Sequence, residues 1–196
     1  MKRTLIIAGV VIIALFFGYR FFAGSYNNMV DREETVKRSW SQVENVYQRR
    51  LDLIPNLVNT VKGAADFEKS TLTAVIEARA NATQVKVDPA NMSAEELARF
   101  QQAQGQLGTA LGRLMVVVEQ YPQLKANENF LSLQVQLEGT ENRITVERMK
   151  FNEDVKEYNA YIRKFPQVML ASMYGFRERP FFAAEEKAAK APEVKF

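Results

Sequence analysis

An all-α fold is the first prediction from this sequence: one N-terminal transmembrane helix followed by a long antiparallel helical bundle of three to four helices. Three observations lead to it. An uncharged apolar run opens the chain, apolar residues then recur every three or four positions, and only nine glycines and six prolines interrupt 196 residues. Long elements with this period are typical of helices that bury one face. We expect a membrane anchor over residues 1–24, a bundle over 25–180 and a flexible tail over 181–196.

The membrane anchor is predicted from the run between Thr4 and Tyr19, which carries no charge. From Leu5 to Phe22 a helix would span about 27 Å, close to the hydrocarbon thickness of a bilayer. Its main lipid-facing side chains are expected to be Leu5, Ile6, Ile7, Val10, Val11, Ile12, Ile13, Leu15, Phe16 and Phe17. A cleaved signal peptide is the rival interpretation, although bulky Phe21 and Phe22 replace the small residues that a cleavage site needs.

The charges beside this run give a weaker indication of its orientation. Lys2 and Arg3 favour a cytoplasmic N-terminus, which would leave the bundle on the outer side of the membrane. Arg20 and Arg32 lie on the other flank and reduce the asymmetry. The expected topology is therefore a single pass, with the bundle leaning towards the extracytoplasmic side.

The first bundle helix is expected to extend from about Tyr26 to Asn81. Its apolar positions step by three or four, at Trp40, Val43, Tyr47, Leu51, Ile54, Val58, Val61 and Ala65. Pro55 lies within this pattern and removes the backbone donor that would bind the carbonyl of Leu51. Because the apolar spacing continues past the proline, we expect a bend and not an end. Arg50 or Asn56 could supply a donor to the freed carbonyl.

Charged residues surround this proline and recur on the expected antiparallel partner helix, in the run LEGTENR. The predicted polar network comprises Arg49, Arg50, Asp52, Pro55, Asn56, Glu138, Glu141 and Arg143. We expect one of the two arginines to pair with Glu138 or Glu141, and Asp52 to accept from Arg143 or from backbone. Such a network would fix the register between the two helices. An intersubunit contact and a small-molecule or ion site are the alternative interpretations.

The next helix is predicted to begin at a capping box formed by Ser93 and Glu96, and to run to about Tyr121. Three of its glycines share roughly one face: Gly105, Gly108 and Gly112. Small residues there would allow a neighbouring backbone to approach closely; a hinge is the alternative.

A second long helix is expected from about Glu128 to Phe165, closed by Pro166. One broad apolar face is predicted for it, formed by Leu131, Val135, Leu137, Ile144, Val146, Met149, Phe151, Val155, Tyr158 and Ile162. A shorter segment, QVMLASMYGF, follows and ends near Gly175. The remaining chain has too little apolar content to pack alone, so we expect it to fray, although its phenylalanines could dock.

Composition excludes several function classes. The chain has no cysteine and no histidine, which rules out a disulfide, a thiolate zinc site, a cysteine nucleophile and an imidazole base. A net charge of +3 without a basic block gives no argument for nucleic-acid binding. For the aromatic pair Trp40 and Tyr47, core packing is expected in place of a base-stacking platform. We therefore expect no enzyme, no catalytic or cofactor-binding residue, no metal site and no nucleic-acid partner.

Three long segments resemble the LemA family of bacterial membrane-anchored helical proteins. They are YNNMVDREETVKRSWSQVENVYQRRLDLIPNLVNTVKG, YPQLKANENFLSLQVQLEGTENRITVERMKFNEDVKEYN and FPQVMLASMYGF, with a C-terminal Phe196. One departure is Phe151-Asn152, where the family usually has Tyr-Asn. The resemblance implies a single transmembrane helix and an antiparallel bundle in a bacterial cell membrane, with no established enzymatic activity. It also implies roles in the cell envelope, and one branch is associated with magnetosome membranes.

Two functions follow as hypotheses. In the first, the protein binds the lipid bilayer and self-associates as a homo-oligomeric scaffold that organises the membrane, since wide apolar helix faces exceed what a thin bundle can hide. The Ala14-x-x-x-Gly18 pair would add a weak transmembrane contact. In the second, it is an adaptor that binds another envelope protein, such as a protease or sensor, through a helical groove.

Overall fold

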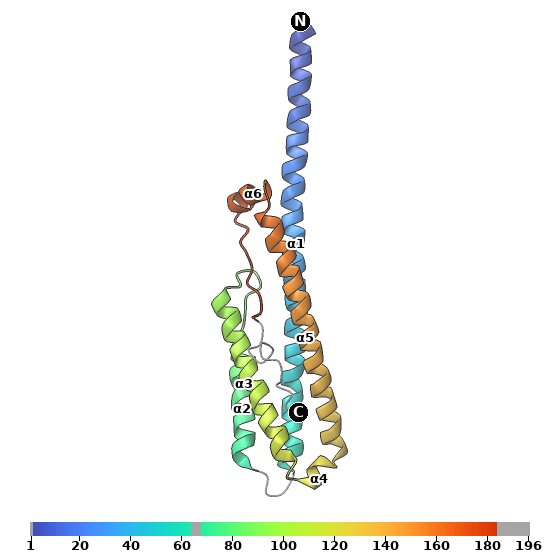
Figure 1. Ribbon diagram of the computed structural model, residues 1–196, viewed down its shortest axis with the longest axis vertical. Helices are drawn as coiled ribbons and strands as arrows, with labels where there is room; N and C mark the ends of the chain where they lie inside the picture. The colour runs from blue at the N-terminus through green and yellow to red at the C-terminus, as the bar shows by residue number, and fades with distance from the viewer. Residues whose placement is uncertain (1, 64–67, 184–196) are drawn as a thin grey trace, which may run out of the picture.

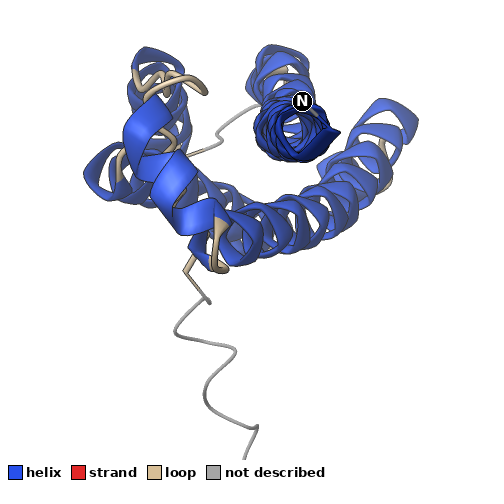
Figure 2. Cartoon of the chain, turned by 90° about the horizontal axis from the view of Figure 1, so that it is seen from above, coloured by secondary structure: helices blue, strands red, loops and turns tan. Residues whose placement is uncertain are grey.

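The computed structural model describes residues 2–63 and 68–183, and over these residues the chain is helical with connecting loops (Figures 1 and 2). The helices are α1 (Lys2–Lys62), α2 (Lys69–Gln84), α3 (Ala94–Val118), α4 (Pro122–Lys125), α5 (Glu128–Arg163) and α6 (Gln167–Tyr174). The predicted all-α class is confirmed. The capping box is also present, because Ser93 Oγ accepts from the amide of Glu96 while the Glu96 carboxylate accepts from that of Ser93.

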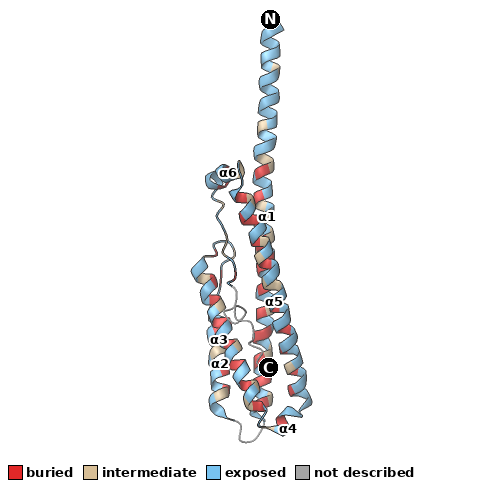
Figure 3. Cartoon of the chain, in the orientation of Figure 1, coloured by how far each residue is buried: buried red, intermediate tan, exposed pale blue. Residues whose placement is uncertain are grey.

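The first third of α1 stands clear of the bundle (Figure 1), and its side chains are exposed (Figure 3). The ten apolar residues of the predicted anchor range from 51% exposed at Val11 to 72% at Leu5. The apolar window in this helix is long enough to cross a membrane, and none of it is buried inside the protein. An apolar surface of this size is costly in water, so the segment suggests membrane anchoring.

Helix α1 continues without interruption from the anchor through Pro55 to Lys62, about 90 Å at the helical rise. The prediction of one helix to Asn81 is wrong, because α1 ends before Gly63 and α2 begins at Lys69. Ala65, one of the predicted positions, lies outside the described residues. Apolar spacing misses this break because both helices have the same period.

Four of the helices form the body of the molecule in alternating directions. Figure 1 shows α1 descending from the anchor, α2 returning, α3 descending again and α5 rising beside α1, with short α4 at the far end. Helix α1 packs mainly on α5, and α2 packs mainly on α3. Helix α6 rests on α1 and α5 at the end of the bundle nearest the anchor.

The core divides into two apolar clusters along the bundle. The cluster nearer the anchor surrounds Trp40, which makes edge contacts with Phe100 and Phe151, so Trp40 is a core residue as expected. The distal cluster is mainly aliphatic, apart from Phe130, and Leu57 and Leu107 in it are fully buried. Between the two clusters the buried positions are polar, a layer described below as part of the candidate site.

After α6 the chain turns at Gly175, which adopts φ +79°, and runs back as an extended strap over residues 176–183. Two asparagines of α5 hold it. The side-chain amide of Asn159 donates to the carbonyl of Arg179 (2.8 Å) and its oxygen accepts from the Arg179 amide (2.9 Å). Asn152 makes the same two bonds with the backbone of Phe182, at 3.2 and 2.9 Å.

The spacing of the two asparagines along α5 explains why they bind strap residues that are three positions apart. Seven residues of α-helix rise about 10 Å, and three residues of extended chain cover about the same distance. Phe182 is thereby placed in the core, stacked on Trp40 with 5.9 Å between ring centroids. Beside it, burial and the nearby charge of Glu33 raise the pKa of Tyr158 to about 12.

The strap corrects the start of the expected tail. Phe182 is only 4% exposed, so the packed chain continues past residue 180, and frayed chain does not describe residues 181–183. Residues 184–196, including Phe196, lie outside the described residues. The sequence signal that could have indicated the strap is the aromatic-asparagine pair that occurs twice on α5, one heptad apart, as Phe151-Asn152 and Tyr158-Asn159.

Replacing Asn159 with alanine is expected to release the strap. The backbone of Arg179 would lose two partly buried hydrogen bonds, and we expect the free energy of unfolding to fall by about 1–3 kcal/mol. Limited trypsin digestion after Arg177 should become faster. The control is Asn142→Ala on the exposed side of the same helix, which should change neither measurement.

Candidate functional site

A layer of buried polar residues crosses the bundle between its two apolar clusters. Arg50 of α1, Gln104 of α3 and Thr140 of α5 are each at most 7% exposed. Thr140 satisfies its hydroxyl on the carbonyl of Gln136 in its own helix, at 2.7 Å. Of the three residues, only Arg50 has a partner on another helix, described below, and Gln104 Oε1 has no hydrogen-bond partner among the described residues. A shifted helix register would separate Arg50 from that partner.

The carbonyl that Pro55 frees is bound by an arginine from another helix. Arg79 of α2 donates from Nε to the Leu51 carbonyl oxygen at 2.9 Å. This bond replaces the missing amide of residue 55 and attaches α2 to α1 at the level of the proline. The sequence analysis proposed Arg50 or Asn56 as donors, and that assignment is wrong: Asn56 is exposed, and Arg50 is directed elsewhere.

Arg50 reaches α5, where Nη1 lies 3.2 Å from Glu141 Oε2. This is one of the pairings considered from the sequence. The two partners differ in environment, since the Arg50 side chain is 8% exposed and that of Glu141 is 52% exposed. On its other side the guanidinium lies against Gly108 of α3, where an added Cβ would be 3.0 Å from Nη2. Arg50 therefore joins α1, α3 and α5.

The remaining members of the predicted network lie outside this layer. Asp52 is exposed and accepts from Gln48 Nε2 at 2.7 Å, so its predicted bond with Arg143 or backbone is not formed. Glu138 is exposed and accepts from Gln134 at 3.0 Å. Arg49 and Arg143 are exposed on the surface. The structure thus keeps Arg50, Glu141 and Pro55 at the crossing and adds Arg79, which sequence reasoning missed.

The three glycines of α3 differ in their surroundings, which the sequence analysis did not expect. Only at Gly108 would a Cβ meet another side chain, and that neighbour is a guanidinium and not a helix backbone; at Gly105 and Gly112 nothing lies within 4 Å. The prediction of close helix packing along all three glycines is therefore wrong. The open space beside them belongs to a groove.

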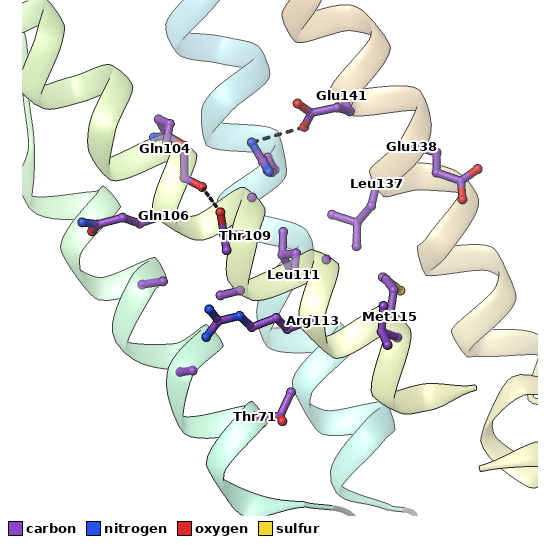
Figure 4. A pocket seen from close by; sticks show the side chains of 18 of the residues that line it. Thr71, Gln104, Gln106, Thr109, Leu111, Arg113, Met115, Leu137, Glu138 and Glu141 are labelled. Carbon is purple, nitrogen blue, oxygen red and sulfur yellow. Dashed lines mark hydrogen bonds and ion pairs between the residues drawn. The ribbon is translucent and has the colours of Figure 1, made fainter. Parts of the chain in front are cut away.

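This groove extends along α3 between α2 and α5, and Tyr47 and Arg50 of α1 also line it (Figure 4). Glu138 and Glu141 of α5 both line it, and in Figure 4 the Glu141 carboxylate forms the ion pair with Arg50. The volume of the groove is about 1940 Å³, beyond the roughly 300–1,000 Å³ of small-molecule sites. An open groove of this size suits a polypeptide segment better than a small ligand.

Helix α5 carries a second apolar surface on its outer side. The ten apolar positions predicted as one broad face divide into two opposite faces. Leu137, Ile144, Phe151, Val155, Tyr158 and Ile162 are buried. Leu131, Val135, Val146 and Met149 are 44–68% exposed and share the other face, since their spacings fit whole helical turns. We call these four residues the outer stripe of α5. Near its middle, Gly139 has open space around it.

No group of three or more acidic side chains that could hold a metal ion occurs in residues 2–63 and 68–183. The carboxylates of the crossing do not cluster, since Glu141 faces an arginine and Asp52 faces a glutamine. These two carboxylates therefore serve a helix crossing and a helix surface.

The sequence also matches a family of known proteins. The sequence profile of the LemA family matches residues 39–196. The chain belongs to the LemA family. Among curated relatives of this LemA-family chain, magnetosome protein MamQ 2 of Paramagnetospirillum magneticum is 30% identical over 186 residues, covering 86% of this chain and 68% of the relative. MamQ of Magnetospirillum gryphiswaldense matches to the same extent. Protein LemA of Metamycoplasma hominis is 23% identical over 168 residues, covering 86% and 73%.

The bond between Arg79 and the Leu51 carbonyl can be tested by a double-mutant cycle. Arg79→Met keeps an apolar stem but leaves the carbonyl unsatisfied, and should lower the free energy of unfolding by about 1–3 kcal/mol. In a Pro55→Ala background the amide of residue 55 can bind the carbonyl, so the same change should cost less than about 1 kcal/mol. Urea unfolding in detergent micelles provides the measurement, with Arg113→Met on exposed α3 surface as control. Equal costs in both backgrounds would contradict the assignment.

The two glycine positions provide a matched pair. Gly112→Ala should raise the free energy of unfolding by about 0.5–1 kcal/mol, because alanine is the better helix former and the added methyl group meets nothing. Gly108→Ala has the same propensity gain but displaces Arg50 from Glu141. We expect it to be at least about 1 kcal/mol less stable than Gly112→Ala. Identical stabilisation by both changes would show that Arg50 moves at no cost.

Proposed function

We propose that this LemA-family protein is a non-enzymatic, membrane-anchored scaffold that self-associates in the bacterial cell envelope. The observation that carries the proposal is the outer stripe of α5, with Val135 67% and Met149 68% exposed on the face opposite the core. Leu131 to Met149 span about 27 Å along the helix. Four large apolar side chains in line on a solvent-facing helix are typical of a surface that packs against another helix.

A second copy of the chain is the favoured occupant of the stripe because the anchor brings copies together. The span suggested by the N-terminal helix would confine them to one membrane and raise their effective concentration. A modest interface is then sufficient. Gly139, within the stripe, leaves room for a neighbouring helix to approach. The MamQ relatives are named as magnetosome proteins, which is compatible with a role in organising a membrane patch.

An adaptor function is the second candidate, favoured by the groove that runs along α3 between α2 and α5. Its lining mixes small residues such as Gly105 with polar ones such as Gln106 and the half-exposed Glu141. An amphipathic segment of another envelope protein, for example a protease or sensor, would fit such a groove. For both candidate functions, we propose that the helical bundle lies on the extracytoplasmic side of the membrane.

Self-association can be tested by cysteine crosslinking, since the natural chain contains no cysteine. Val135→Cys in the full-length protein, oxidised in native membranes, should give a disulfide-linked dimer because two outer stripes face each other. The control is Ala98→Cys, an exposed position on α3, which should remain monomeric under the same conditions. Reducing and non-reducing gels separate the two results.

Equal crosslinking at both positions would indicate random collision and count against the stripe. A monomer for Val135→Cys at every protein-to-lipid ratio would refute self-association through α5. If a photoreactive side chain at Gln106 then captured a different membrane protein, the adaptor function would replace the scaffold.

A further inference from the structure

Helix α6 and the residue preceding its first turn expose an apolar surface that the bundle does not use. Phe165 is 81% exposed, Met169 63% and Met173 70%. Val168 is exposed on the same side, while Leu170 and Ala171 face the core. The sequence of α6, QVMLASMY, contains no charged residue. A short uncharged helix with bulky apolar side chains turned outwards is unfavourable in water.

The position of α6 relative to the anchor indicates what covers this surface. Tyr174 packs on Tyr26 of α1 with 5.0 Å between ring centroids, and Phe176 packs on the same tyrosine at 5.7 Å. Tyr26 lies four residues beyond Phe22, the end of the apolar span, which is about 6 Å along the helix. The polar headgroup region on each side of a bilayer is about 5–8 Å thick. Tyr26 and α6 are therefore at the depth of the headgroups.

We propose that α6, with Phe165, is a second membrane contact that lies in the headgroup region of the bilayer crossed by α1. Phe165, Met169 and Met173 insert their side chains towards the acyl chains, and Tyr26 and Tyr174 form an aromatic pair at the same level. The inference depends on the anchor of the proposed function but not on self-association. It assigns the uncovered surface to lipid because α6 packs on Tyr26, close to the end of the apolar part of α1.

The charges beside α6 agree with a lipid surface. Lys164 immediately precedes Phe165, Arg177 follows Phe176, and both are exposed. Arg20 on α1 lies within the same end of the molecule. Arg163 pairs with Glu178 at 3.6 Å, so one acidic group here is already compensated. Basic side chains around an apolar surface favour anionic headgroups over a neutral protein partner.

Two contacts with a bilayer restrict the rotation and tilt of the bundle more strongly than a single contact does. A single helix can rotate about its own axis and tilt, whereas a second contact on α6 would hold the bundle at one azimuth relative to the membrane. The side chains of the outer stripe of α5 would then face one fixed direction in the plane of the membrane.

The experiment measures the depth of single labelled positions in the full-length protein. Met173→Cys and, separately, Met169→Cys carry an NBD fluorophore in nanodiscs of phosphatidylcholine and phosphatidylglycerol, with or without 5-doxyl lipid, whose spin label lies near the headgroups. Ala98→Cys is the control in water, and Ile12→Cys with 12-doxyl lipid is the reference for the anchor. Both α6 side chains are largely exposed, so the substitutions remove little packing; circular dichroism checks that the helical content is unchanged.

We expect at least about twofold lower fluorescence with 5-doxyl lipid at both α6 positions, and no change at Ala98. Fluorescence at the α6 positions that is as insensitive to 5-doxyl lipid as that of the control would overturn the inference. In that case a blue-shifted emission would indicate a protein neighbour over α6, and an unshifted one would indicate water. Quenching at Ile12 but not at α6 would refute only this inference, whereas its absence at Ile12 would refute the anchor as well.

Discussion

The freed carbonyl of Leu51 is the constraint on which the rest of the bundle depends. Helix α1 runs uninterrupted through Pro55, so one partly buried backbone acceptor has no donor in its own helix. Arg79 of α2 supplies that donor. Because an unsatisfied carbonyl is costly, this bond favours the register of α2 on α1 that brings Arg79 to this level. The α2–α3 hairpin is positioned with it.

Arg50, the residue before Leu51 on α1, lies in the polar layer that divides the two core clusters and also lines the groove. Its guanidinium lies between Gly108 of α3 and Glu141 of α5, in a layer that also contains Gln104. A half-exposed ion pair contributes little stability, so its main effect is on register. One side chain of α1 contacts both α3 and α5 at this level.

The surfaces left uncovered are arranged in order along the molecule. The apolar anchor comes first, α6 with Met169 and Met173 follows at the membrane-proximal end, and the outer stripe of α5 with Val135 lies further along the bundle. Within the described part of the chain there is no acidic cluster suited to a metal. We propose lipid as the cover of α6 and a second copy of this LemA-family protein as the cover of the outer stripe.

The sequence by itself determined the features that depend on near neighbours in the chain. These are the anchor, the helical class, the capping box at Ser93 and the passage of α1 through Pro55, because hydropathy, period and capping act over a few residues. Tertiary structure decided which groups meet. The donor to Leu51 comes from 28 residues away, and Asn159 binds backbone 20 residues away. Val135 and Phe151 are both apolar in the sequence, but tertiary packing decides which is buried, since Trp40 of α1 and Phe182 of the strap cover only Phe151. A side chain's partner depends on the relative placement of whole helices, which no local pattern encodes.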